Sequence, residues 1–201
     1  YYITKPRKST PEHPVKGEGM SFYSPEEVII AHNEGRADMH AIIKVRVQVR
    51  EDDKLVTRLT ETTVGRVIFN QVVPEDFGYI NELLTKKSLR SIVGEMVRRE
   101  GTAVTTKFLD DIKNMGYYQA YKGGLSFNLG NVLVPQMKSN LISDANSKAS
   151  EIREFEKMGF MGPNERYNQI VDLWTDVNAK LTQEVLKVLS SEDQGFNPVY
   201  I

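Results

Sequence analysis

The chain has 201 residues, and 26 lysine and arginine residues against 27 aspartate and glutamate residues give it a formal net charge of -1. This balance argues against a protein that binds nucleic acid by itself, because phosphate binding leaves a clear basic excess. No stretch approaches the roughly 18 uninterrupted apolar residues of a membrane span. The absence of cysteine excludes disulfides and Cys-based zinc sites and is compatible with a cytoplasmic location.

The N-terminal part predicts irregular chain followed by a short helix. Residues 1–7 contain neither an initiator methionine nor the apolar core of a signal peptide, so we expect the interior of a longer chain. Ser24 can cap a helix, Pro25 suits its first position, and Glu27 completes a capping box. We expect this helix to end at Gly35.

The pattern then changes to that of a small antiparallel sheet. Residues 43–50 alternate apolar and polar side chains, which predicts a strand with one wet face. Residues 51–54 are a predicted turn, and 55–59 a returning strand. Because residues 61–73 are rich in β-branched side chains, they predict a further strand, with Gly65 as a bulge or a point of close backbone approach.

Helical spacing follows, together with the one local concentration of positive charge. Apolar residues recur at helical spacing over 80–97, and a second short helix is expected over 102–114, ended by Gly116. The aromatic, glycine-rich stretch 117–131 lacks the spacing of a phosphate-binding loop. Residues 86–100 carry five cations against two anions: Lys86, Lys87, Arg90, Arg98 and Arg99, with Glu95 and Glu100. This cluster either attracts a polyanion or solvates a helix, and its charge does not decide between them.

The last third predicts an antiparallel helical hairpin over 136–158 and 164–191, separated by chain-breaking residues. Apolar residues in its second helix step by three and four, typical of a coiled-coil seam: Tyr167, Ile170, Trp174, Val177, Leu181, Val185 and Val188. The facing stripe is Met137, Leu141, Ala145, Ala149, Ile152, Phe155 and Met158. We therefore predict an α+β fold, with a mixed α/β domain over 1–130 and a second domain over 131–201 that holds a projecting hairpin and a C-terminal linker.

No catalytic or metal-binding constellation emerges. Neighbouring helical residues such as Asp110 and Asp111 point in different directions, so they make a poor acid–base pair. The acidic run 51–53 could bind a cation, but a polar turn explains it better. Trp174 could stack on a base, although packing in the seam is favoured. The three histidines lack the spacing of a metal site, and we expect no bound metal.

Five strings in the chain, in this order, resemble the β′ subunit of bacterial RNA polymerase. They are KGEGM at 16–20, TTVGR at 62–66, the lysine pair 86–87, NERYNQIVDLW at 164–174 and GFNPVY at 195–200. The resemblance covers essentially the whole chain and corresponds to the pore and funnel segment. In that family the segment follows the Asp-rich NADFDGD motif, which holds the catalytic magnesium, and precedes an SGARG region. Neither motif occurs in this chain.

The resemblance implies a part of a nucleotidyltransferase that is inactive by itself, because two-metal phosphoryl transfer needs the Asp cluster. It implies a wall of the secondary channel, through which nucleoside triphosphates enter and backtracked RNA leaves, with Lys86, Lys87 and Arg90 as a basic cluster of the pore. Magnesium would belong to the intact enzyme only. The implied partners are the β, α and ω subunits, with DNA reached only through the full enzyme and no membrane.

The hairpin resembles the channel rim on which transcription factors of the Gre and DksA types dock. The residues that match the family's rim are Glu165, Arg166, Asn168, Gln169 and Asp172. Enteric members carry lysine where this chain has Gln169, and losing that charge removes a contact of roughly 1.5–3 kcal/mol. This counts against binding of guanosine tetraphosphate at the rim but not against factor docking. The alternative is a free-standing coiled-coil adaptor without a role in polymerisation.

Overall fold

The computed structural model describes residues 1–51 and 54–201, which form two compact units, Tyr1–Gly124 and Leu125–Ile201. Helices and a small sheet occur together, so the predicted α+β class is confirmed. The predicted turn and the acidic run at 51–54 include residues outside the described part of the chain. The domain boundary between 130 and 131 stays a prediction.

The first unit contains a sheet with the strand order β1-β2-β3, made of β1 (Ser21–Phe22), β2 (Ile42–Glu51) and β3 (Lys54–Thr63). Strand β1 pairs parallel with β2, and β2 pairs antiparallel with β3, so that Val45 lies opposite Thr60. The alternation predicted the inner face of β2 correctly, since Ile43, Val45 and Val47 are buried.

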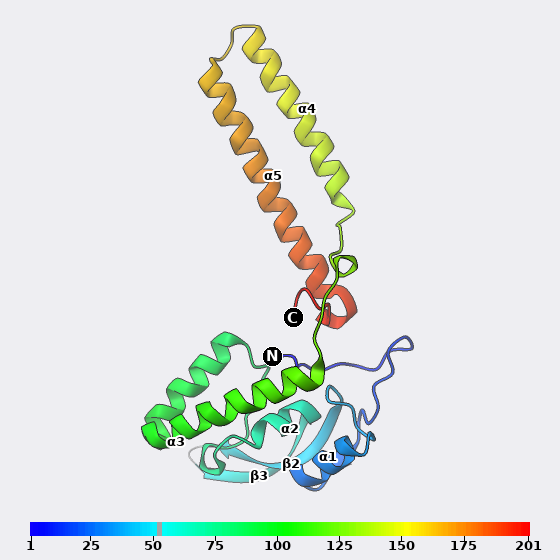
Figure 1. Ribbon diagram of the computed structural model, residues 1–201, viewed down its shortest axis with the longest axis vertical. Coiled ribbons are helices and arrows are strands. Elements are labelled where there is room, and N and C mark those ends of the chain that lie inside the picture. The colour runs from blue at the N-terminus through cyan, green and yellow to red at the C-terminus, as the bar shows by residue number, and fades with distance from the viewer. Residues whose placement is uncertain (52–53) are drawn as a thin grey trace. The chain divides into compact units, whose positions relative to one another are not determined.

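Helix α1 (Pro25–Asn33) begins as the sequence predicts. The Ser24 side chain accepts a hydrogen bond from the N–H of Glu27, and Pro25 occupies the first turn. The Glu27 carboxylate accepts from the N–H of Tyr23, one residue before the predicted capping-box donor. Val28 and Ala31 of α1 join the buried residues of β2 in one core, so α1 packs on the inner face of the sheet (Figure 1).

The predicted strand over 61–73 is wrong, because β3 ends at Thr63 and helix α2 (Val64–Asn70) follows directly. Local capping outweighs β-propensity here: the Thr63 side chain accepts from the N–H of Arg66 and starts the helix. Gly65 is a point of close backbone approach, as one of the two predicted alternatives had it, but it lies in a helix. The turn into α2 buries Val67 and Ile68 in the core that α1 shares.

Helix α3 (Lys86–Gly123) consists of two helical stretches that meet at Gly101, where φ is 80° and ψ is 175°. The prediction that Gly116 ends the second stretch is wrong, since the helix continues to Gly123 and closes on Gly124 in a left-handed conformation. The predicted helical spacing from Ile80 begins too early, because Thr85 caps α3.

The angle between the two stretches of α3, visible in Figure 1, lets both contribute to a second core. Ile92 and Met96 come from the first stretch and Phe108 from the second. Phe69 at the end of α2 meets Phe108 edge-to-face, with 6.4 Å between ring centroids. This core also includes Phe77 of the 3-10 helix η1 (Glu75–Phe77).

The second unit contains the short 3-10 helix η2 (Leu129–Asn131) and two long helices, α4 (Met137–Lys157) and α5 (Pro163–Ser191). The two helices pack side by side as a hairpin whose bounds lie within one residue of those predicted (Figure 1). Ala145 and Ala149 of α4 are buried in the seam, which allows the helices to approach closely. The half-buried or buried seam residues of α5 are Ile170, Leu173, Val177, Leu181, Val185, Val188 and Leu189.

Two residues assigned to the seam lie outside it. Tyr167 is 65% exposed, and Trp174 is 38% exposed at the flank of the seam, while Leu173 is more buried than either. On the predicted facing stripe, Met137 and Phe155 of α4 and its C-cap residue Met158 are also exposed. A seam that follows Ile170, Leu173 and Val177 steps by three and four as the predicted one does, so spacing alone could not distinguish the two.

The base of the hairpin is held by the GFNPVY string, which begins at Gly195, the last residue of the 3-10 helix η3 (Glu192–Gly195). Asn197 is buried, and its Nδ2 donates to the carbonyl oxygen of Asn131 at 2.9 Å and to the Glu192 carboxylate. Its Oδ1 accepts from the N–H of Val199 at 2.8 Å. These bonds tie the C-terminal residues to the segment that enters α4.

Candidate docking surface and basic cluster

The tip of the hairpin begins with a Schellman motif at the end of α4. The N–H of Gly159 donates to the carbonyl of Glu156 at 2.9 Å, and the N–H of Phe160 donates to that of Phe155 at 3.0 Å. Gly159 has a φ of 82°, which favours glycine. The rings of Phe155 and Phe160 meet edge-to-face with 6.3 Å between centroids, which supplies the apolar contact of this motif.

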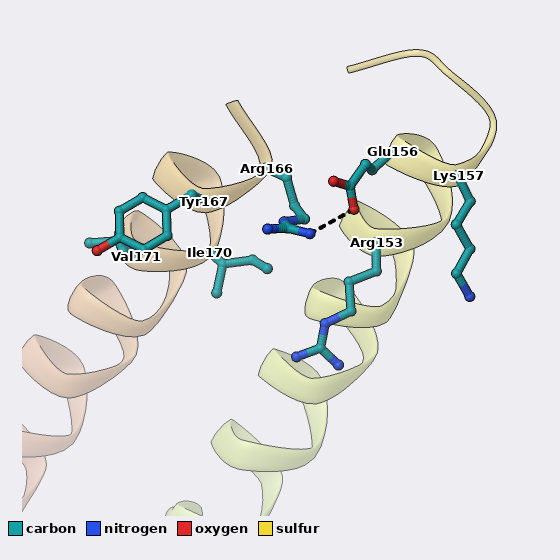
Figure 2. A pocket seen from close by; sticks show the side chains of 7 residues that line it. All are labelled: Arg153, Glu156, Lys157, Arg166, Tyr167, Ile170 and Val171. Carbon is teal, nitrogen blue, oxygen red and sulfur yellow. Dashed lines mark hydrogen bonds and ion pairs between the residues drawn. The ribbon is translucent and has the colours of Figure 1, made fainter. Parts of the chain in front are cut away.

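An ion pair joins the two helices beside this turn. Arg166 Nη1 donates to Glu156 Oε2 at 2.9 Å, and the two side chains are 37% and 24% exposed. Figure 2 shows the pair bridging the gap between α4 and α5. The pair borders a hollow of about 490 Å³ that Arg153, Lys157, Tyr167, Ile170 and Val171 also line.

The rim residues that the sequence singled out are placed differently from one another. Glu165, Asn168 and Asp172 are exposed on α5, and their side chains are accessible in this chain. Gln169 is half-buried, and its Nε2 donates to Glu165 Oε1 at 3.4 Å. Arg166 is directed at Glu156. Glu165, Asn168 and Asp172 are therefore accessible on α5, whereas Arg166 is engaged within the hairpin.

Two features of this surface were not predicted from the sequence. Glu156, the partner of Arg166, has no distinguishing sequence signal other than its position near the end of α4. Tyr167, Val171 and Trp174 form an exposed apolar stripe at spacings of four and three, beside the seam. The exposed stripe has the same period as the seam, so a helical period does not reveal which of them faces the partner helix.

The basic cluster lies at the start of α3, where Lys86, Lys87 and Arg90 are all exposed. Thr85 and Ser88 cap this helix reciprocally: the N–H of Ser88 donates to Thr85 Oγ1 at 3.2 Å, and the N–H of Thr85 donates to Ser88 Oγ at 2.8 Å. The first turn contains no acidic residue, although helix dipoles favour anions there. Further along α3, Arg99 pairs with Glu95 at 2.7 Å.

A polar network built on the TTVGR string holds the segment that leads into α3. Arg66 Nη1 donates to Asn81 Oδ1 at 2.9 Å, and Arg66 Nε donates to the carbonyl of Thr4 at 3.1 Å. Thr62 Oγ1 donates to Asn81 Oδ1 at 2.8 Å and lies 2.9 Å from the hydroxyl of Tyr79. Burial raises the pKa of Tyr79 to about 12, so its hydroxyl keeps its proton in this network.

His32, His40 and Asp110 are engaged in local contacts in the described part of the chain. Within 1–51 and 54–201, no group of three metal-ligating side chains occurs. His32 and His40 each place Nδ1 2.9 Å from a backbone carbonyl, those of Ala37 and Lys5. Asp110 pairs with Lys113 at 2.8 Å. In the described part of the chain, no helix is both long and apolar enough to span a bilayer.

Comparison with known families gives these features a context. The model of the family described as RNA polymerase Rpb1, domain 3, matches residues 1–132, which include the sheet, α1 to α3 and the basic cluster. The chain belongs to this family. The hairpin lies beyond the matched residues and is covered by individual relatives.

The relatives are DNA-directed RNA polymerase β′ subunits of bacteria. The chain is 48% identical over 203 residues to the subunit of Phocaeicola vulgatus, 49% identical over 201 residues to that of Karelsulcia muelleri, and 47% identical over 202 residues to that of Flavobacterium psychrophilum. Each match covers 100% of this chain and 14% of the relative, so the chain corresponds to a segment of the β′ subunit. The family match favours the polymerase interpretation over the free-standing adaptor.

Proposed function

We propose that this chain forms the wall and rim of the secondary channel in a bacterial RNA polymerase, with the helical hairpin as a docking site for transcription factors that insert into the channel. The observation that carries the proposal is the exposure of Glu165, Asn168 and Asp172 on α5, within a chain that matches β′ subunits along its whole length. Factors of the Gre and DksA types, which reach the channel as rigid helical pairs, are the proposed partners.

The basic cluster supports the proposal that this chain lines a path for polyanions. Lys86 and Lys87 place positive charge in the first turn of α3, where the dipole makes cations unfavourable by about 0.3–1 kcal/mol each, and Arg90 adds a third cation one turn further on. Helix stability therefore gives no reason for this arrangement, whereas attraction of triphosphates and of backtracked RNA does. The cluster raises the local concentration of anions and does not take part in bond formation.

The chemistry of nucleotide addition is proposed to lie elsewhere in the assembled, cytoplasmic enzyme. The chain lacks an Asp-rich motif that could hold two magnesium ions, and the described residues contain no cluster of metal ligands. The 201-residue chain incubated with primed template, magnesium and nucleoside triphosphates should give no RNA above the blank. Templated synthesis by the chain alone would contradict this assignment. The proposed partners of the chain are then the β, α and ω subunits and, through the full enzyme, DNA.

The docking proposal is tested in assembled polymerase that carries Glu165→Ala with Asp172→Ala. Affinity for a Gre-type cleavage factor should fall at least tenfold, about 1.4 kcal/mol, because a few central side chains hold most of the energy of an interface. The matched control is Glu151→Ala with Glu154→Ala, which removes the same charge from exposed positions on α4. Factor-independent elongation should be unchanged in both. Equal factor binding by the first variant and the parent would contradict docking at this surface, and impaired elongation would indicate a role in the pore.

A further inference from the structure

We infer that Arg166 is a positioning residue, which acts through Glu156 as a clamp across the tip and holds the first turn of α5 where Glu165 and Asp172 can meet a partner. The resemblance of the hairpin to the channel rim suggested Arg166 as a contact residue, whereas the structure directs its guanidinium at Glu156, ten residues earlier in the chain (Figure 2). This inference rests on the proposed docking function, which supplies the partner.

The apolar seam of the hairpin stops short of the tip. Ile152 and Ile170 are half-buried, but beyond them Phe155, Met158 and Tyr167 are all exposed. Little apolar surface therefore joins the end of α4 to the start of α5. The Glu156–Arg166 pair lies in this stretch and links the last turn of one helix to the first turns of the other.

The start of α5 has no side-chain cap. Its N-cap residue is Gly162, which has no side chain to cap the free N–H groups. Glu165 lies in this first turn, so any fraying there displaces a residue of the docking surface. The cross-tip clamp thus stabilises the turn that presents Glu165.

The signs of the two charges are opposite to those that the helices themselves favour. Glu156 lies in the last turns of α4, at the negative end of its dipole, and Arg166 lies near the positive end of α5. Each charge is unfavourable in its own helix, and the two are compensated by one another at 2.9 Å. By contrast, Lys148–Asp144 and Lys180–Asp176 each join residues of one helix and are more exposed.

Contact and positioning roles for Arg166 make different predictions. If Arg166 touches the partner, Glu156→Gln leaves the guanidinium free and factor affinity stays the same or rises. If it acts as a clamp, Glu156→Gln and Arg166→Gln remove the same interaction and weaken binding alike. Exchanging the charges, with Glu156→Arg and Arg166→Glu together, restores the clamp and places each charge at the helix end that favours it.

The test uses assembled polymerase with these three variants and Arg153→Gln as a control, since Arg153 lines the same hollow. Amide hydrogen exchange over 158–166 measures the clamp itself, and dissociation of the Gre-type factor measures its consequence. Both single variants should speed tip exchange and weaken factor binding about three- to fivefold, the range of a half-exposed ion pair. The exchanged pair should restore both, and Arg153→Gln should change neither the exchange nor the affinity by that factor.

Two results would overturn the inference. Unchanged tip exchange in both single variants would show that no clamp exists. Weak binding by Arg166→Gln and by the exchanged pair, with normal binding by Glu156→Gln, would make Arg166 a contact residue. A failure of the docking proposal itself is recognised separately, because Glu165→Ala with Asp172→Ala would then leave factor binding intact while tip exchange still reports on the clamp.

Discussion

Gly65, in the first turn of α2, lies directly against the backbone carbonyl of Ile3. A Cβ at position 65 would fall 1.7 Å from the Ile3 oxygen, and the N–H of Gly65 donates to the carbonyl of Met39 at 2.8 Å. The first residues of the chain, the segment before β2 and the start of α2 thus meet at one glycine. Because the atoms nearest to position 65 are all backbone, no flexible side chain could move aside to admit a Cβ.

Replacing Gly65 with alanine should therefore destabilise the chain by about 3 kcal/mol or more, since overpacking against backbone forces a shift of main chain. The free energy of unfolding of the 201-residue chain in urea measures this. Gly116→Ala is the control, because its site in α3 is open and alanine favours helix by about 1 kcal/mol. Equal stability of Gly65→Ala and the parent would contradict the close approach.

Gly159 at the hairpin tip should be sensitive to substitution for another reason, its backbone conformation. Its φ of 82° strains any residue with a Cβ, although the space around it is open. Gly159→Ala should cost about 1–2 kcal/mol of hairpin stability, measured by thermal unfolding of the chain. Gly162→Ala, in open space at ordinary φ, should cost less, roughly 0.5–1 kcal/mol, because alanine is a poorer N-cap than glycine. Similar losses from the two substitutions would show that the Schellman turn is unimportant.

His40 should make the stability of the first unit depend on pH. Burial lowers its pKa below the ordinary 6.5, and the charges of Arg7 and Lys5 act in the same direction, outweighing the Lys5 carbonyl and Asp38. As the pH falls through 6.5, His40 in the unfolded chain binds its proton first. The free energy of unfolding should decrease there and stop decreasing below the folded-state pKa.

Urea unfolding at a series of pH values from about 8 to 5 checks this dependence, a range that brackets histidine titration. In His40→Gln the slope near pH 6.5 should be flatter than in the parent, even if the variant is less stable at every pH. An unchanged slope in His40→Gln would assign the pH dependence to other groups.

The basic cluster should influence triphosphate use in the assembled enzyme. Changing Lys86, Lys87 and Arg90 together to glutamine should raise the KM for nucleoside triphosphates several-fold at low salt and leave kcat nearly unchanged, because steering acts on encounter. The difference should shrink as salt rises. The control changes the exposed residues Lys44, Lys107 and Lys138 to glutamine and removes the same charge elsewhere. Equal KM values for the two triple variants would contradict steering by this cluster.

Local signals in the sequence determined much of the secondary structure. The alternation of 43–50 predicted β2, Ser24 and Pro25 predicted the start of α1, and the breaker residues at 159–163 predicted the hairpin turn. Each of these signals acts within a few residues, where capping, side-chain period and backbone conformation are decided. The resemblance to polymerase β′ subunits also followed from the strings themselves and agrees with the family match.

Tertiary structure decided what local signals left open. The strand predicted for 61–73 became α2 because Thr63 caps it and Gly65 fits against Ile3, a contact with residues far away in the sequence. The two stretches of α3 share one core, in which Ile92 and Met96 of the first and Phe108 of the second join Phe69 of α2. Arg166 belongs to a clamp because the hairpin brings Glu156 within 2.9 Å of it. Packing and pairing between distant residues depend on the folded geometry, and the period or charge of a single segment does not contain that geometry.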